Sequence, residues 1–333
     1  MKSVKQFFGF LLVLVIVAGA YIAYKIYIPY NIGTEIRSVT INENDSFPVV
    51  LKNLNHAGVL KSDYIFKIMA IFSGVDKKLS PGRYDFVGRI SLYDVLRKLK
   101  NKDIATLMVT IPEGLSVYKI AGLVAARLDI DSAEFVARAF DTAFAENQYN
   151  IGGFEGYLFP ETYRLWYGIK TDQIFDILLT EFRHKSSGLF DSLQDSHYSA
   201  RELLVLASII EAEARADDEK PLISSVYHNR LKRKMKLQAD PTVIYALGGL
   251  DRPLLYKDLE VDSPYNTYKH EGLPPGPINS PGLASIKAAI NPAETNYLYF
   301  VADGNGRHIF SRTLVEHNRA KRKIKLDLKM SGQ

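Results

Sequence analysis

The chain has 333 residues, a length at which two domains are expected. It contains no cysteine, which excludes disulfides and thiolate metal sites and is compatible with an oxidising compartment. The formal net charge of +5 is mild, and the basic residues are spread along the chain. Such a charge permits contact with an anionic surface but does not indicate nucleic acid, so no nucleic-acid partner is expected.

The N-terminus predicts a single membrane-spanning helix over residues 7–28, preceded by a cytoplasmic tail at 1–6. The run FFGFLLVLVIVAGAYIAY at 7–24 carries no charge and spans about 27 Å as a helix, close to the thickness of a bilayer core. The alternative is a cleaved signal peptide, since Ala18-Gly19-Ala20 resembles a cleavage site, but the apolar run continues past it. Lys2 and Lys5 favour a cytoplasmic N-terminus, which places the chain after Pro29 outside the cytoplasm.

An internal repeat follows the predicted anchor. VTINENDS at 39–46 matches VTIPEGLS at 109–116 in five of eight positions, at an offset of 70 residues. Each copy predicts a strand, a helix capped by Ser46 or Ser116, a second helix capped by Ser62 or Ser132, and a Gly-x-Tyr element at 81–86 or 155–160. This pattern is similar to LysM modules, which bind glycans containing N-acetylglucosamine. We therefore expect a LysM-like domain at 29–105 and a second LysM-like repeat with its connection at 106–198. The alternative is an old duplication kept for packing.

The remaining segment, 199–330, predicts a mainly helical domain. Ser199 and Glu202 form a capping box before an apolar helix, and a second helix begins near Asp217 and can hold Pro221 in its first turn. Its basic end, which includes Arg230, predicts a solvated helix end or, alternatively, a contact with anionic polymer or lipid headgroups. A long Pro- and Gly-rich loop at 263–282 is typical of a functional segment. A strand pair around Asp303-Gly-Asn-Gly306 predicts a C-terminal β-hairpin.

Glu211 is the candidate catalytic residue. On a helix over 202–215 it lies about 20° from Leu204 and about 40° from Ala207, on the apolar side, whereas Glu213 points toward the opposite, solvent side. Burial disfavours a charged carboxylate, so Glu211 is expected to hold a proton and to donate it. Two alternatives remain open: a buried ion pair with an Arg or Lys, or a side chain that turns toward the surface.

Four blocks together resemble the endolytic murein transglycosylase family of the MltG type (YceG-like): LASIIEAEA, VYHNRLKRKMKLQADPTVIYALG, SPYNTYKHEGLPPGPINSPGLASIKAAINPA and YLYFVADGNGRHIFS. The resemblance covers nearly the whole chain. It implies an α+β protein with a transmembrane helix, duplicated LysM-like modules and a lysozyme-like catalytic domain at 199–330. It also implies that Glu211, the Glu of the Ala-Ser-Ile-Ile-Glu element, is the catalytic acid of a peptidoglycan lytic transglycosylase. Such enzymes cut nascent glycan strands internally, between N-acetylmuramic acid and N-acetylglucosamine.

The resemblance implies a mechanism that needs one carboxylate. Glu211 would protonate the bridging oxygen and then accept the proton of the C6 hydroxyl, which closes a 1,6-anhydro ring on the muramoyl sugar. Asp240 would be the second carboxylate if the reaction were hydrolysis. Asp-Pro-Thr at 240–242 is instead interpreted as a helix start with Asp240 as N-cap.

Three further residues are predicted to bind substrate, by analogy with lysozyme-like lytic enzymes. Gln238 would hydrogen-bond the sugar, with an ordinary loop amide as the alternative. Tyr265 and Asn266 would supply a stacking face and a hydrogen bond, with a turn capped by Asn266 as the alternative. Glu155 and Glu161 are interpreted as belonging to structural strand ends, with a place in the lining of the cleft as the alternative. The histidines show no metal-ligand spacing, so neither a metal nor a cofactor is expected.

The resulting hypothesis is an enzyme of the cell inner (cytoplasmic) membrane with a periplasmic or extracytoplasmic catalytic domain, which terminates glycan strands. Its partners would be peptidoglycan strands and the membrane, with peptidoglycan synthases as candidate partners. The competing hypothesis is a membrane-anchored scaffold that binds peptidoglycan without cutting it.

Overall fold

The computed structural model describes residues 2–190 and 197–330, and it is a mixed α+β structure in which helices predominate. Its described strands form four two-stranded sheets, β1–β4, β2–β3, β5–β6 and β7–β8. The chain divides into two compact units. Unit 1 comprises the residues up to 108 together with 164–169, and unit 2 comprises 109–163 and the residues from 170 onward.

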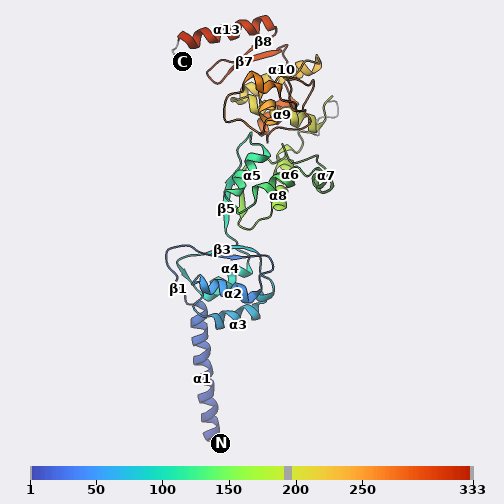
Figure 1. Cartoon of the computed structure of the whole chain (residues 1–333). Helices are drawn as coiled ribbons and strands as arrows, with labels where there is room; N and C mark the ends of the chain where they lie inside the picture. Colours follow the sequence, from blue (N-terminus) through green and yellow to red (C-terminus); the bar gives the residue numbers. More distant parts are fainter. Residues whose placement is uncertain (1, 191–196, 331–333) are drawn as a thin grey trace. The chain divides into compact units, whose positions relative to one another are not determined.

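The first helix, α1 (Lys2–Tyr27), is the long helix that carries the N-terminus in Figure 1. Its stretch Gln6–Tyr27 is long and apolar enough to cross a membrane, with a mean hydropathy of 2.4 and none of its length buried in the protein. The helix predicted over 7–28 is therefore present. Its length, composition and exposure are consistent with a single-pass anchor.

Unit 1 continues with a strand–helix–helix–strand arrangement. Val39 on β2 faces Tyr84 on β3 in an antiparallel pair, and both side chains enter a core formed with the helices that follow. Ser46 and Ser62 stand at the N-caps of their helices as predicted, although neither side chain bonds the helix backbone. The elements are β1 (Tyr30–Asn31), β2 (Arg37–Ile41), α2 (Phe47–His56), α3 (Asp63–Ser73), β3 (Gly82–Phe86), β4 (Arg89–Ile90) and α4 (Leu92–Lys100).

The second copy of the repeat also runs from strand to helices to strand, with one helix more. Its helix cap at Ser132 is a wrong prediction, because Asp131 is the N-cap and accepts hydrogen bonds from Ala133 N and Glu134 N. The Gly-x-Tyr element at 155–160 is a turn, and the strand that pairs with β5 follows it. The elements are β5 (Thr106–Thr110), α5 (Val117–Ala125), α6 (Ser132–Ala139), α7 (Thr142–Tyr149), β6 (Thr162–Trp166) and α8 (Thr171–Ser186).

The rest of unit 2 is built around α9, which packs against α10 and α12. The predicted capping box is confirmed, since Ser199 Oγ accepts from Glu202 N while Glu202 accepts from Ser199 N. The predicted hairpin is confirmed as β7–β8. The elements are α9 (Ala200–Glu213), α10 (Lys220–Lys232), α11 (Asp240–Ala246), α12 (Leu283–Ile290), β7 (Tyr299–Ala302), β8 (His308–Ser311) and α13 (Leu314–Met330).

Helix α9 is buried on all sides rather than on one stripe. Every residue from 203 to 210 is buried, which is the pattern of a central core helix and not of a surface helix. The prediction that one side of this helix faces solvent is therefore wrong. The first turn is exposed, and the last turn, which carries Glu211 and Glu213, emerges from the core at the other end of the helix.

Arg230 also differs from its prediction. The side chain is buried, and it donates to the carbonyl oxygens of Leu298 (2.7 Å) and Leu237 (2.6 Å). It therefore joins α10 to the segments before β7 and α11, and it is not part of a solvated helix end.

An aromatic cluster supports the first part of unit 2. The ring of Phe154 is fully buried and stacks on Phe175 at 4.2 Å between centroids. We expect Phe154→Ala to lower the free energy of unfolding by about 3–5 kcal/mol, because it leaves a cavity in a packed core. Urea denaturation measures this, with Phe72→Ala at an 89% exposed position as the matched control. A loss below about 1 kcal/mol would contradict the assigned packing.

Candidate functional site

Two carboxylates lie at the C-terminal end of α9, and they have different surroundings. Glu211 belongs to an ion pair with Lys220 at the start of α10, whereas Glu213 lines a pocket between α10, α11 and α13. The contacts of each carboxylate indicate what it can do chemically.

Three donors converge on one oxygen of Glu211. Lys220 Nζ lies 3.3 Å from Oε2, the amide of Gly282 donates at 3.0 Å, and the hydroxyl of Ser285 donates at 2.6 Å. The side chains of Glu211 and Lys220 are only 9% and 3% exposed. The prediction that Glu211 has apolar surroundings is therefore wrong. The alternative, a buried ion pair with a lysine, is what the structure contains.

The second oxygen of Glu211 is different. Oε1 accepts no hydrogen bond from residues 2–190 or 197–330, and it is not fully buried. This oxygen is accessible, while Oε2 is paired with Lys220, which also lies 2.8 Å from Asp217 Oδ1. Glu211 thus resembles a structural clamp that ties α9 to α10 and to the N-terminus of α12.

Glu113 is a carboxylate next to this clamp that the sequence analysis did not single out. A Cβ atom placed on Gly282 would lie 1.9 Å from Glu113 Oε1, so the carboxyl of Glu113 rests directly against the backbone whose amide binds Glu211. Burial raises the pKa of Glu113, the charge of Glu211 raises it further, and Lys220 opposes the shift. The position of Glu113 in the repeat motif VTIPEGLS was the available signal, but the repeat gave no reason to place it beside α9.

Glu213 occupies a pocket of about 350 Å³. Its Oε1 accepts a hydrogen bond of 2.9 Å from the hydroxyl of Tyr227, which is fully buried. Burial raises the pKa of Glu213 to about 7, and the charge of Asp240 adds to the effect against the opposing hydrogen bond of Tyr227. The expectation that Glu213 is the spare carboxylate in solvent is wrong. Its surroundings instead match the protonated carboxyl that the sequence analysis assigned to Glu211.

Gln238 lines the same pocket as Glu213. Its backbone has a φ of 49°, in the left-handed region, and its amide N–H donates to Thr267 O. The side-chain amide makes no hydrogen bond to the described part of the chain, so its donors and acceptor are available in the pocket. The structure therefore brings Gln238 together with Glu213 and not with the Glu211 clamp.

Asp240 also faces this pocket, and its predicted role as N-cap is wrong. Ala239 is the N-cap residue of α11, and Asp240 is the first residue of the helix. Its Oδ1 accepts a hydrogen bond of 2.5 Å from the hydroxyl of Tyr268, another pocket residue. Asp240 is thus held as a charged neighbour of Glu213.

Tyr265 and Asn266 do not line the Glu213 pocket, although Asn266 contacts Tyr268, which does. Asn266 is fully buried and donates to the carbonyl oxygens of Leu259 and Val261, while its Oδ1 accepts from Tyr268 N. This is the alternative stated for Asn266, a residue that holds the turn. The ring of Tyr265 packs on Tyr245 at 4.9 Å.

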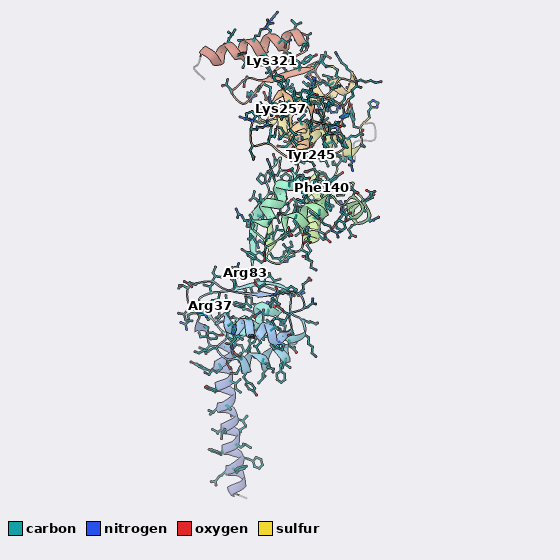
Figure 2. All side chains as sticks on the ribbon, in the orientation of Figure 1. Arg37, Arg83, Phe140, Tyr245, Lys257 and Lys321 are labelled. Carbon is teal, nitrogen blue, oxygen red and sulfur yellow. The ribbon has the colours of Figure 1, made fainter. Side chains whose placement is uncertain are left out.

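Glu155 is structural, as interpreted from the sequence. Both of its oxygens accept from the amide of Val117 at the start of α5, and Oε2 accepts from the hydroxyl of Tyr245, which is labelled in Figure 2. Burial raises its pKa to about 8. Glu161 pairs with Lys185 at 3.2 Å.

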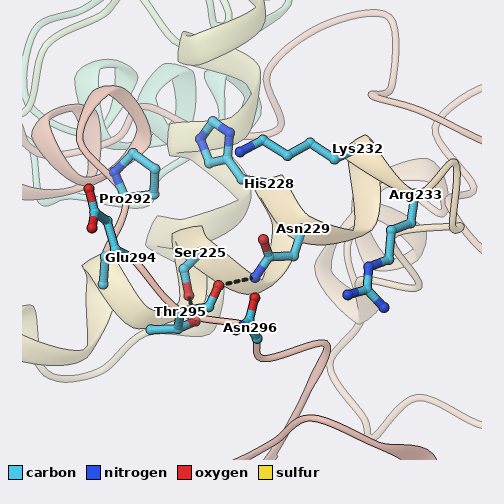
Figure 3. A pocket seen from close by; sticks show the side chains of 10 residues that line it. Ser225, His228, Asn229, Lys232, Arg233, Pro292, Glu294, Thr295 and Asn296 are labelled. Atoms are coloured by element: carbon cyan, nitrogen blue, oxygen red, sulfur yellow. Dashed lines mark hydrogen bonds between the residues drawn. The ribbon is translucent and has the colours of Figure 1, made fainter.

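A larger pocket of about 570 Å³ lies between α10 and the segment after α12 (Figure 3). Its polar groups largely bond one another: Ser225 lies 2.7 Å from the hydroxyl of Thr295, and Asn229 donates to the carbonyls of Thr295 and Tyr297. His228 lies 2.9 Å from the carbonyl of Ala289, and its pKa is lowered by burial. Glu294 is the carboxylate of this pocket, and no pair of acids is assembled in it.

Comparisons with known proteins agree with this architecture. Residues 39–323 match the YceG-like family, so the chain belongs to that family. It is 34% identical to an endolytic murein transglycosylase of Bacillus subtilis (strain 168), over 86% of this chain and 84% of the relative. It is 28% identical to an endolytic murein transglycosylase of Streptococcus pneumoniae serotype 2 (strain D39), over 91% of this chain but 62% of the relative's length. A crystal structure of a YceG-like protein from Listeria monocytogenes is similar, with a TM-score of 0.60 and 32% identity, over 86% of this chain and 98% of that one.

The buried ion pair predicts a non-additive effect on stability. We expect Lys220→Met to lower the free energy of unfolding by about 3–5 kcal/mol, because it leaves the Glu211 carboxylate buried without its cation. Adding Glu211→Gln to this variant is expected to cost less than the sum of the two single changes. Urea denaturation measures all three variants, with Lys287→Met on the exposed face of α12 as the control. Additive losses would contradict the pairing.

Proposed function

We propose that this protein is a membrane-anchored lytic transglycosylase that cleaves the bond between N-acetylmuramic acid and N-acetylglucosamine within peptidoglycan strands and leaves 1,6-anhydro ends. Its membership of the YceG-like family and the names of its relatives support this activity. The apolar helix α1 supports the membrane anchor. On this proposal the anchor is at 7–28, LysM-like modules are at 29–105 and 106–198, and the catalytic domain is at 199–330.

The location and role of the enzyme are part of the proposal. The lysines before α1 favour a cytoplasmic N-terminus, which would place the catalytic domain outside the cytoplasmic membrane, where nascent strands are made. Internal cleavage of a nascent strand would end its elongation. Peptidoglycan synthases are therefore candidate partners.

Glu213 is the residue that we assign as the acid, and its position in the pocket is the observation that carries this assignment. A glycosidic oxygen leaves readily only if it is protonated as the bond breaks, so the donor must hold a proton near neutral pH. A carboxyl with a pKa of about 7 in a pocket of about 350 Å³ meets this requirement. Glu211, the residue that the family motif predicts, is accessible only through Oε1, and its other oxygen is occupied by Lys220, Gly282 and Ser285.

The proposed reaction uses one enzymic carboxyl twice. Glu213 gives its proton to the bridging oxygen, the bond from that oxygen to C1 of the muramoyl sugar breaks, and C1 takes on oxocarbenium character. The carboxylate then accepts the proton of the C6 hydroxyl on the same sugar while the C6 oxygen bonds to C1. The proton returns to Glu213, no water is consumed, and the products are a free 4-hydroxyl and a 1,6-anhydro ring.

The neighbours of Glu213 fit supporting roles. Tyr227 fixes the carboxyl through its 2.9 Å hydrogen bond. The free amide of Gln238 is placed to hold a hydroxyl or N-acetyl group of the sugar. Asp240 contributes negative charge that favours the protonated acid and stabilises a developing cation.

Substitution of the two glutamates tests the assignment. We expect Glu213→Gln to lower the release of anhydro ends by at least about hundredfold, because the proton donor is removed. Glu211→Gln should retain measurable turnover and lose stability instead. Mass spectrometry of products from uncrosslinked glycan measures turnover, and thermal unfolding measures stability. Loss of turnover in folded Glu211→Gln with retention in Glu213→Gln would assign the acid to Glu211. Absence of anhydro ends from the digest of the unmodified chain would favour a glycan-binding scaffold.

The pH dependence gives an independent prediction. A general acid works in its protonated form, and the pKa of Glu213 is about 7. We therefore expect kcat/KM to be constant below this value and to fall about tenfold per pH unit above it. Initial rates of anhydro-end formation between pH 5 and pH 9 measure the profile. A rate that rises through this range would contradict the role of Glu213 as acid.

A further inference from the structure

A second pocket in unit 2 has no role in the reaction described above. It has a volume of about 260 Å³ and lies between the start of α5, the C-terminal end of α9, α11 and the segment before α12. Its lining includes two tyrosine rings, a serine, a lysine and an asparagine, which are Tyr118, Tyr245, Ser116, Lys119 and Asn279. Apolar ring faces with a few polar groups between them are typical of a small-molecule or saccharide site.

This pocket is a neighbour of the Glu213 pocket. Ala212 lines it, and the next residue on α9, Glu213, lines the other pocket. The same holds on α11, where Pro241 lines this pocket and Asp240 lines the other. Since consecutive Cα atoms are about 3.8 Å apart, the two pockets are separated by little more than the backbones of these two helices.

Asn279 supplies an unused acceptor at this pocket. The residue is 4% exposed, and its Nδ2 donates to the carbonyl of Ser208 at 2.8 Å, which fixes the orientation of the amide. Its Oδ1 is buried without any hydrogen-bond partner. An unpaired buried acceptor costs about 1–3 kcal/mol, a cost that a ligand N–H or O–H reaching it would remove.

Ser116 supplies a hydroxyl for a related reason. It was expected to cap α5, but Glu155 binds the amide of Val117 in its place, and Ser116 makes no side-chain cap bond. The Ser116 hydroxyl therefore remains available at the edge of the pocket.

The two tyrosine rings are held in different ways. Tyr245 is fixed by its hydrogen bond to Glu155 and by its packing on Tyr265. Tyr118 is 53% exposed, and its ring lies 5.3 Å from that of Phe140, which is labelled with Tyr245 in Figure 2. An exposed ring beside a pocket offers an apolar face without the need to rearrange the core.

We infer that this pocket is a saccharide subsite, which binds an N-acetylhexosamine unit of the glycan strand at a distance from the bond that is cut. The inference rests on the proposed function for the identity of the polymer. The ring of Tyr118 would cover the apolar face of the sugar, Asn279 Oδ1 would accept its acetamido N–H, and Ser116 would bond a hydroxyl. A polymer held here as well as at Glu213 would be cut within the strand and not at its end, as an endolytic enzyme requires.

The test measures binding apart from cleavage. The full chain in detergent, with Glu213→Gln to prevent turnover, is titrated with the tetrasaccharide of N-acetylglucosamine by calorimetry. Adding Tyr118→Ala is expected to weaken binding about five- to tenfold, because the stacking face is lost. Tyr256→Ala, at a 92% exposed position in the same unit, is the matched control and is expected to bind like the parent.

Two results would overturn the inference. One is an unchanged affinity in the folded Tyr118→Ala variant. The other is binding of a sugar-free stem peptide that Tyr118→Ala abolishes, because the pocket would then be a peptide site. Failure of the proposed function is distinguishable, since in that case the unmodified full chain releases no anhydro ends from uncrosslinked glycan, whatever the effect of Tyr118→Ala on binding.

Discussion

The site depends on which hydrogen-bond donors and charges surround the two acidic side chains at the end of a buried helix. Helix α9 is buried on every side from 203 to 210, so carboxylates placed directly after this segment cannot both reach open solvent. Glu211 is satisfied by a cation and two further donors from α10 and α12. Glu213 accepts one hydrogen bond from Tyr227, and burial raises the pKa of its carboxyl to about 7.

The contacts of Glu211 help to position Glu213. The clamp around Glu211 fixes the last turn of α9 against Lys220 and Ser285, which sets the direction in which Glu213 projects. Two carboxyl groups two residues apart thus have different hydrogen-bond partners, and the proposed function gives them different roles. This division is the physical pattern expected of an acid that must be protonated beside groups that must stay charged.

The sequence predicted the parts that depend on local patterns. The apolar helix at the N-terminus, the capping box at Ser199 and the C-terminal hairpin are all present. The family assignment rested on long specific blocks, and it is confirmed. The sequence could not distinguish Glu211 from Glu213 in this way. Helical periodicity assumes one apolar face and one solvent-exposed face, whereas residues 203–210 of α9 are buried on every side.

Other differences also came from tertiary contacts. Arg230 has the local sequence of a solvated basic run, but distant carbonyl oxygens of Leu298 and Leu237 enclose it. The amide of Val117 at the start of α5 donates to Glu155, 38 residues away in the sequence, and not to the hydroxyl of Ser116. The side-chain amide of Asn266 makes its hydrogen bonds within its own loop. None of these partners follows from spacing, since each depends on how separate segments fold together.

The central claim is that the carboxyl of Glu213 keeps a proton near neutral pH. Titration of the full chain with carbon-13-labelled glutamate, assigned by comparison with Glu213→Gln, measures this directly by NMR. The account predicts a carboxyl resonance with a midpoint near pH 7 that is absent from the variant. A Glu213 midpoint near that of an ordinary glutamate, about 4.3, would contradict it.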